Sequence, residues 1–133
     1  MGVAENKQVV LDFYDAGARG DMDECFALLA DDVTWTNIGS TKFSGTYIGK
    51  QAIAEDLLGP LFSRLKAGIS SQIERLTAED DIVVAQTSGT AETTDGKPYN
   101  NTYCQVIRIH NGQIVAVKEY MDTALIDSVF GTR

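Results

Sequence analysis

Glu119 is the side chain with the clearest potential for chemistry, because it lies between Val117 and Met121 at the spacing of two that places residues on one face of a strand. A carboxylate in such apolar surroundings has its basicity raised by desolvation, as a general base requires. Asp122 falls on the opposite face and suits a helix cap. We therefore predict Glu119 as the catalytic acid or base. The alternative places Glu119 at the sheet rim beside Arg108.

Amide and hydroxyl side chains accompany this carboxylate on other predicted strands. We predict Asn37 and Tyr103 as its catalytic partners, which would orient a substrate or a water molecule. A further set would line the ligand-binding cavity: Phe13, Trp35, Gln86, Ser88, Asn101, Gln105, Val117 and Met121. The alternative is a polar network in which these groups satisfy one another.

A long hairpin carries most of these residues. Two runs rich in β-branched residues, 103–109 and 114–120, flank Asn111-Gly112, and Asn-Gly is the strongest short signal for a tight hairpin turn. Strands are also predicted at 69–78 and 82–93, separated by acidic or glycine-containing turns. Because the turns are short, the sequence predicts an antiparallel meander.

The first half of the chain is mostly helical. Apolar spacing predicts helices at 4–18, 22–30 and 50–66, with a kink or break at Gly59-Pro60. A strand is predicted at 33–38 and a polar loop at 39–49, where it could cover a cavity mouth. The segment from Thr123 predicts a short terminal helix.

This element order predicts one α+β domain over residues 1–133. We expect a cone-shaped barrel in which three N-terminal helices pack on a strongly curved, mostly antiparallel sheet, with a short C-terminal helix. Such a cone leaves a space for a small ligand.

Composition excludes several classes of function. The formal net charge of −8 disfavours nucleic acid and anionic membranes as partners, because both bind basic patches. Two cysteines and a single histidine offer neither a disulfide framework nor a zinc-type cluster, so we expect no metal, no cofactor and a cytoplasmic location. The N-terminal residues contain no long apolar run, so neither a secretory signal nor a membrane span is expected.

Four segments carry a family resemblance: ADDVTWTN, GKQAI, DGKPYNNTY and NGQIVAVKEYMD. Together with the element order, they make the chain from about Val9 to Phe130 resemble the nuclear transport factor 2-like superfamily, in its SnoaL-like and ketosteroid-isomerase-like branch. The resemblance implies the cone-shaped fold. It leaves the function open among isomerases, epoxide hydrolases, polyketide cyclases, dehydratases and binding domains.

The residues of ketosteroid isomerases carry over poorly. The position that resembles their general-base Asp is Asn37, whose amide cannot abstract a proton. The match to their oxyanion-hole Tyr is Phe13, with Tyr14 one residue off the required face. Their second acidic donor falls near Cys104 or Gln105, which supply no carboxyl. The resemblance therefore disfavours steroid isomerisation by that mechanism.

Limonene-epoxide hydrolases give a partial match. Asn37 matches their water-holding Asn, Trp35 replaces their Tyr, and Glu119 matches one of their acids, whereas their Arg and second Asp fall near Gln86 and Ser88. For SnoaL-like cyclases, the acidic general base would be Glu119 or Asp122, and strand parity favours Glu119.

We expect a small-molecule pocket protein that is a cofactor-independent isomerase, cyclase or hydrolase and uses a pocket carboxylate on a hydrophobic, oxygen-bearing ligand. The alternatives are a non-catalytic ligand-binding module and a structural dimerisation domain whose cone is filled by side chains. The apolar outer face of the sheet predicts a homodimer through that convex face.

Overall fold

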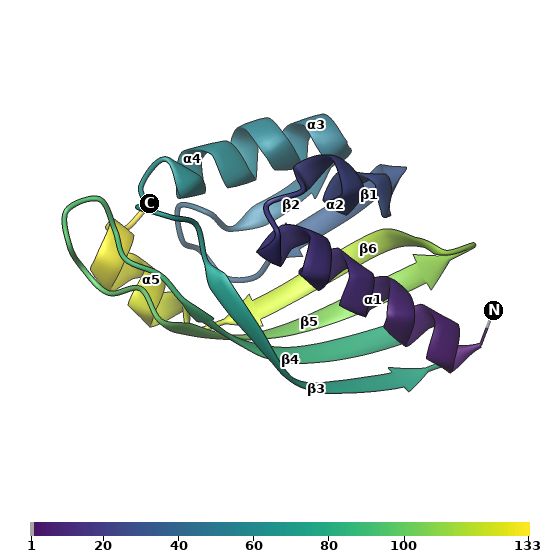
Figure 1. Ribbon diagram of the computed structural model, residues 1–133. Helices are drawn as coiled ribbons and strands as arrows, with labels where there is room; N and C mark the ends of the chain where they lie inside the picture. The colour runs from purple at the N-terminus through teal and green to yellow at the C-terminus, as the bar shows by residue number, and fades with distance from the viewer. Residues whose placement is uncertain (1) are drawn as a thin grey trace.

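A computed structural model describes residues 2–133, and it shows an α+β fold in which helices cover one side of a curved six-stranded sheet (Figure 1). The strand order is β2-β1-β6-β5-β4-β3. The strands are β1 (Leu29–Asn37), β2 (Gly45–Ile48), β3 (Ser70–Glu79), β4 (Ile82–Thr90), β5 (Asn101–His110) and β6 (Gln113–Met121). The helices are α1 (Val3–Ala18), α2 (Met22–Ala27), α3 (Lys50–Ala52), the π-helical η1 (Ile53–Leu58), α4 (Gly59–Phe62) and α5 (Thr123–Phe130). The predicted fold class is confirmed.

The β5–β6 hairpin forms as its sequence predicts. Asn111 and Gly112 have φ angles of 50° and 76°, which is the left-handed conformation that a tight hairpin turn needs at both central positions. The register pairs Gln105 with Glu119 and Tyr103 with Met121. Paired residues share a face, so this register places the carboxylate beside the amide of the neighbouring strand.

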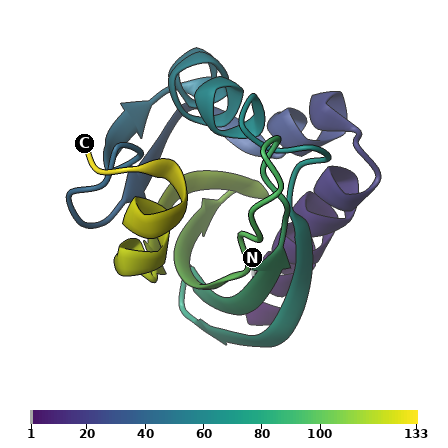
Figure 2. The same cartoon turned by 90° about the vertical axis from the view of Figure 1, so that its left-hand side faces the viewer.

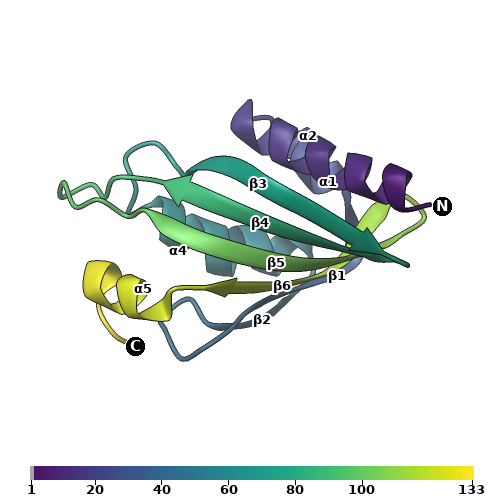
Figure 3. The same ribbon diagram turned by 90° about the horizontal axis from the view of Figure 1, so that it is seen from below.

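Strands β3 to β6 form the predicted antiparallel meander, and β1 joins its far side by pairing in parallel with β6. The sheet curls strongly, as the end-on view shows (Figure 2). Helix α1 lies across the inner side of β3 and β4, while the outer side of the meander is left without a helix (Figures 1 and 3). This curvature separates an enclosed inner face from an open outer face.

Two predicted boundaries are wrong in the first half of the chain. Strand β1 already begins at Leu29, so helix α2 is shorter than expected, and a shift of register between Leu29 and Thr34 accommodates the acidic pair at 31–32. The segment predicted as a loop at 39–49 contains β2, which extends the sheet beyond β1. Strand β2 has only four residues and is mostly exposed, which hides it from a search for apolar alternation.

The helical segment after Gly49 changes its winding where a break is predicted. Residues 53–58 form a π-helix, and the backbone N–H of Gly59 donates to the carbonyl of Ala54. Pro60 follows at the start of α4, where its missing N–H costs least. The segment therefore continues past Gly59-Pro60 as one curved unit over the sheet (Figure 1).

Two hydrophobic clusters hold the helices against the inner face. The first contains aliphatic residues of α1 and of strands β1, β4, β5 and β6, such as Val10, Val33, Val83, Ile107 and Ile114, which are at most 1% exposed. The second gathers around α5 and includes Phe43, Tyr99 and Phe130. The space between these clusters is where the polar side chains of the inner face lie.

Candidate functional site

A cavity of about 580 Å³ lies between the inner face of the sheet and the helices. This volume is in the range of sites for small organic ligands. Aromatic residues form much of its wall: Phe13, Tyr14, Phe26, Trp35, Phe43, Tyr99 and Tyr103. A cone filled by side chains is therefore excluded, and with it the argument for a purely structural dimerisation domain.

The exposed members of the lining locate the cavity mouth. They lie where α1 ends and α2 begins and where α4 leads into β3, and they include Gly17, Met22 and Phe62. Met22 and Phe62 are 41% and 38% exposed, which is high for such large apolar side chains. An apolar ligand would thus meet apolar side chains as it enters.

Among the residues that the structure describes, Glu119 is the only charged one in this lining. It projects from β6 beside Asn37 of β1 and Gln105 of β5, its partners in the sheet register. Among residues 2–133, no Lys, Arg or His lines the cavity. Burial raises the pKa of Glu119 from an ordinary 4.5 to about 7, although a hydrogen bond from Gln105 acts in the opposite direction. The carboxyl can therefore take up or release a proton near neutral pH.

Gln105 connects the carboxylate to a tyrosine of the first helix. Its Nε2 donates to Oε2 of Glu119 at 2.6 Å, while its Oε1 accepts a hydrogen bond from the hydroxyl of Tyr14. Burial, and then the charge of Glu119, raise the pKa of Tyr14, while a hydrogen bond with Thr87 lowers it. Tyr14 remains a neutral phenol linked through one amide to Glu119.

A second group of phenols lines the cavity beside Met121. The hydroxyl of Tyr103 donates to that of Tyr99 at 3.1 Å, and Nδ2 of Asn101 donates to the same Tyr99 oxygen at 3.0 Å. Gly89 of β4 makes room for the Tyr103 ring, because a Cβ at this position would lie 3.0 Å from Cε2 of that ring. Burial is the largest cause of a raised pKa for both tyrosines, so both hydroxyls keep their protons at neutral pH.

Asn37 lines the cavity, but its amide already has protein partners. Its Oδ1 accepts from the indole Nε1 of Trp35 at 3.1 Å, and its Nδ2 donates to the carbonyl of Phe43 at 3.1 Å. The side chain thus fixes the Trp35 ring and the loop before β2. Asn37 therefore contributes to the cavity by positioning Trp35 in its aromatic wall.

Four residues predicted to bind ligand do not line the cavity. Gln86 and Ser88 of β4 face outward, and it is Thr87 between them that reaches the cavity, so the prediction for this pair is wrong. Val117 is buried in the aliphatic cluster. Asn101 is buried behind the wall. The other predicted ligand-binding residues, Phe13, Trp35, Gln105 and Met121, all line the cavity.

Asn101 has a structural role at the end of the hairpin. Its Nδ2 also donates to the carbonyl of Asp122, and its Oδ1 accepts from the backbone N–H of Asp122 and of Thr102. Asp122 itself caps α5 by accepting from the backbone N–H of Leu125, as predicted. Asn101 therefore ties β5 to the start of α5 and holds Tyr99 from behind.

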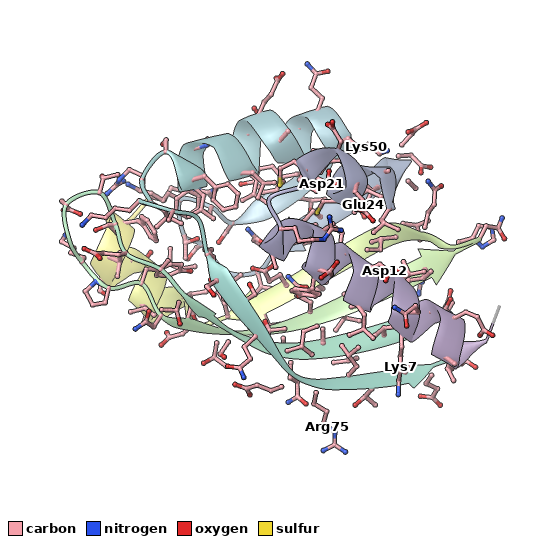
Figure 4. The ribbon with its side chains drawn as sticks, viewed as in Figure 1. Lys7, Asp12, Asp21, Glu24, Lys50 and Arg75 are labelled. Atoms are coloured by element: carbon pink, nitrogen blue, oxygen red, sulfur yellow. The ribbon has the colours of Figure 1, made fainter. Side chains whose placement is uncertain are left out.

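The remaining polar candidates lie outside the cavity. Arg108, the alternative partner of Glu119, pairs instead with Asp81, at 3.4 Å between Nε and Oδ2. Figure 4 shows Lys7, Asp12, Asp21, Glu24 and Lys50 on the helical side and Arg75 extending from β3 away from the helices. These charged side chains do not line the cavity.

Sequence reasoning missed several cavity residues, among them Tyr14, Cys25, Thr87 and Tyr99. The sequence places Tyr14 one residue off the helix face of Phe13, yet both rings line the cavity, at a centroid distance of 5.9 Å. Cys25 of α2 also lines it, with a thiol whose pKa burial raises to about 11. Within residues 2–133, no group of three His, Cys, Asp or Glu side chains is arranged to hold a metal ion.

Comparison with known proteins addresses the family. Residues 10–117 match the family described as the SnoaL-like domain, which is most of the chain. The chain belongs to this family. A search of curated proteins finds no match for this SnoaL-like domain.

Solved structures share the fold of this SnoaL-like domain. A nuclear transport factor 2-like protein from Burkholderia thailandensis is 24% identical with a TM-score of 0.85, and the match covers 98% of both chains. A limonene-epoxide-hydrolase-like epoxide hydrolase from M. tuberculosis is 21% identical with a TM-score of 0.77, covering 95% of this chain and 89% of that one. TerC, co-crystallised with polyporic acid, is 17% identical with a TM-score of 0.84, covering 96% and 99%. The family and the cavity together identify a small-molecule pocket protein.

Proposed function

We propose that this SnoaL-like domain is a cofactor-independent enzyme of the isomerase, cyclase or hydrolase type, with Glu119 as its general acid and base. One observation carries the proposal. Within residues 2–133, Glu119 is the single charged group that lines a largely apolar cavity, and burial brings its pKa to about 7. A carboxyl with a pKa near the working pH is present in both of its protonation states, which suits proton transfer in either direction.

The proposed step is proton transfer next to a carbonyl. The carboxylate of Glu119 takes a proton from the carbon beside the carbonyl, the electron pair of that C–H bond passes to the carbonyl oxygen, and an enolate forms with neutral Glu119. Return of the proton to another carbon of the conjugated system gives the isomer and restores the carboxylate. Gln105 holds Oε2 and leaves Oε1 of Glu119 for the substrate.

Tyr103 supports this step as the catalytic partner from the neighbouring strand, since it lines the cavity and keeps its proton. Asn37 acts indirectly, as a positioning residue for Trp35. Epoxide opening is supported less well, because the charged acid partner that the hydrolases supply has no counterpart in the cavity lining of residues 2–133. A role in ligand binding without turnover is the other outcome of the test.

The test compares wild type with Glu119→Gln on a panel of hydrophobic enones and ketones in D2O, with isomer formation and deuterium incorporation measured by NMR. Wild-type rates should rise with pH around 7, and Glu119→Gln should lose at least a hundredfold. Glu74→Gln, an exposed carboxylate on β3, is the matched control. A Gln variant as active as wild type removes Glu119 from the mechanism, and an inert wild type with a bound ligand supports the binding module.

We also infer a homodimer through the outer face of the sheet. This face has no helix over it (Figure 3), and its side chains include half-buried Val106 and Ala116 beside exposed Tyr120. A second copy can cover the same patch by two-fold symmetry. Light scattering should give about twice the chain mass of 14.4 kDa, and Val106→Glu should shift it to the monomer. A wild-type monomer contradicts this inference.

No helix of residues 2–133 has the length and apolarity required to cross a membrane. The cytoplasmic location predicted from the cysteine content stays a prediction.

A further inference from the structure

A chain of hydrogen bonds leads to Glu119, and each donor in it is directed toward the carboxylate. The hydroxyl of Tyr14 donates to Oε1 of Gln105, and Nε2 of Gln105 donates to Oε2 of Glu119 at 2.6 Å. Thr87 is hydrogen-bonded to Tyr14 and lowers its pKa, which is the effect of a donor on a phenol oxygen. The chain therefore starts on β4, passes through α1 and β5, and ends on β6.

The Gln105 amide is the link in this chain whose orientation can be reversed. A primary amide has an acceptor at one end and a donor at the other, and turning it over exchanges them without a change of shape. In the orientation of the structure, Glu119 receives an N–H from this amide. In the reversed orientation Glu119 would face the amide oxygen, which repels a carboxylate and accepts the proton of a neutral carboxyl. Reversal would thus favour neutral Glu119 and direct its proton into the protein.

Tyr14 selects the orientation in which the amide donates to Glu119. Its oxygen accepts from Thr87, so its own proton remains to be donated. The part of Gln105 that can accept this proton is the amide oxygen, and this contact turns the NH2 group toward Glu119. A reversed amide would take the acceptor away from the Tyr14 hydroxyl, which is costly inside a protein.

The two oxygens of Glu119 differ as a result. Gln105 holds Oε2 as an acceptor, so the exchangeable proton is carried by Oε1. Within residues 2–133, the other titratable groups in the lining come from α1, α2, the start of β5 and the segment before it, and they are Tyr14, Cys25, Tyr103 and Tyr99. Burial raises the pKa of each of these four groups, so all of them are neutral at pH 7 and none competes with Glu119 for the proton.

We propose that Tyr14 and Thr87 are positioning residues that act on Glu119 through the Gln105 amide. They hold Oε2 of Glu119 as an acceptor and leave Oε1 as the oxygen that exchanges a proton with a ligand in the cavity. The inference rests on the proposed function, because it explains how the fold directs proton transfer to one oxygen of the carboxyl group.

The test measures the pKa of Glu119 directly, in protein that carries 13C at the side-chain carboxyl of glutamate. The resonance of Glu119 is the one that Glu119→Gln removes, and in wild type it should titrate with a midpoint of about 7. Tyr14→Phe removes the phenol proton, allows the amide to reverse, and should raise this midpoint by about half a pH unit or more. Gln105→Leu removes the direct donor and should raise it by about one unit or more.

Two matched comparisons distinguish positioning from a merely structural role. Tyr103→Phe removes a second phenol of the same cavity, whose hydroxyl donates to Tyr99, and should leave the midpoint within about 0.2 unit of wild type. Thr87→Val should raise the midpoint in the same direction as Tyr14→Phe but by less, because it acts one link further along the chain. Thr87→Ser keeps the hydroxyl and should retain the wild-type midpoint.

Three results would overturn the proposal. They are a Tyr14→Phe variant with the wild-type midpoint, a Tyr103→Phe variant whose midpoint rises as much as that of Tyr14→Phe, and a Thr87→Ser variant that behaves like Thr87→Val. The titration needs no substrate, so it is independent of the test of catalysis. A raised midpoint in Tyr14→Phe together with an inert wild type would support the positioning chain and overturn the proposed function. An active wild type whose midpoint is unchanged by Tyr14→Phe would overturn this inference alone.

Discussion

The inner face of the sheet differs between its two ends, although the same strands build both. At the end covered by the middle of α1, the inward residues are aliphatic, with Val83, Ile107 and Val117 on three adjacent strands at 0%, 1% and 3% exposure. A few residues further along the same strands, the inward positions hold Thr87, Gln105 and Glu119. On β5 and β6, the change from aliphatic to polar side chains occurs between inward positions that are two residues apart.

This contrast shows how one sheet separates stability from ligand chemistry. The aliphatic end packs against the helix and supplies apolar burial. The polar end leaves 580 Å³ unfilled, and its amides and hydroxyls are held by hydrogen bonds to one another and to Glu119. Substitutions at equivalent positions of the two ends should therefore affect different measurements.

The largest effect is expected at the aliphatic end. Ile107→Ala should lower the free energy of unfolding by about 2–5 kcal/mol, because a fully buried aliphatic side chain leaves a cavity when truncated. Gln105→Leu, two residues away on the same face, should cost about 1 kcal/mol while it alters ligand binding and the pKa of Glu119. Two measurements compare the variants: unfolding by urea, and binding of prodan, a fluorescent naphthyl ketone. Equal losses of stability would contradict the division between the ends.

A smaller effect on stability is expected at the polar end, where Glu119 ionises as pH changes. Its pKa is about 7 in the folded chain and near 4.5 when exposed, so between these values the folded state holds more protons than the unfolded state. Stability should therefore fall as pH rises from about 4.5 to 7, by up to about 3 kcal/mol.

Glu119→Gln provides the control for this slope. The neutral amide keeps the size of the side chain and cannot titrate. The free energy of unfolding of the variant should therefore change less across the same pH range, and the variant should be more stable than wild type at pH 8. The measurement is urea unfolding at a series of pH values. A slope that persists in the Gln variant would assign it to other groups.

Local periodicity was enough to predict the residues of the hairpin. The Asn-Gly turn fixes the register of β5 and β6, and alternation along β6 then places Glu119 on the same face as Val117 and Met121. The fold class follows from the order of helices and strands for the same reason, since short connections force neighbouring strands to pair.

Alternation along a strand does not predict the inward face where the strand is apolar on both faces. In β4, residues 82–85 are all apolar, so their pattern does not reveal which face is buried, and the resemblance to epoxide hydrolases alone selected Gln86 and Ser88. The pairing of Thr87 with Tyr103 shows which face of β4 is directed inward. Such pairing joins residues that are far apart in the sequence, so local periodicity does not predict it. Tyr14 was missed for a related reason: the rotation of α1 about its axis depends on the sheet beneath it.

The smallest effect in this series is expected on the outer face. It tests the corrected assignment of which β4 side chains face the cavity. Gln86→Ala should change the free energy of unfolding by less than about 0.5 kcal/mol and leave prodan binding unchanged, because the exposed side chain points away from the cavity. Thr87→Val, its neighbour on the inner face, keeps the shape of the side chain but removes the hydroxyl that is hydrogen-bonded to Tyr14. Loss of this bond should raise the pKa of Tyr14 further and alter the prodan emission. Weakened binding in Gln86→Ala with none in Thr87→Val would reverse the assignment of the two faces of β4.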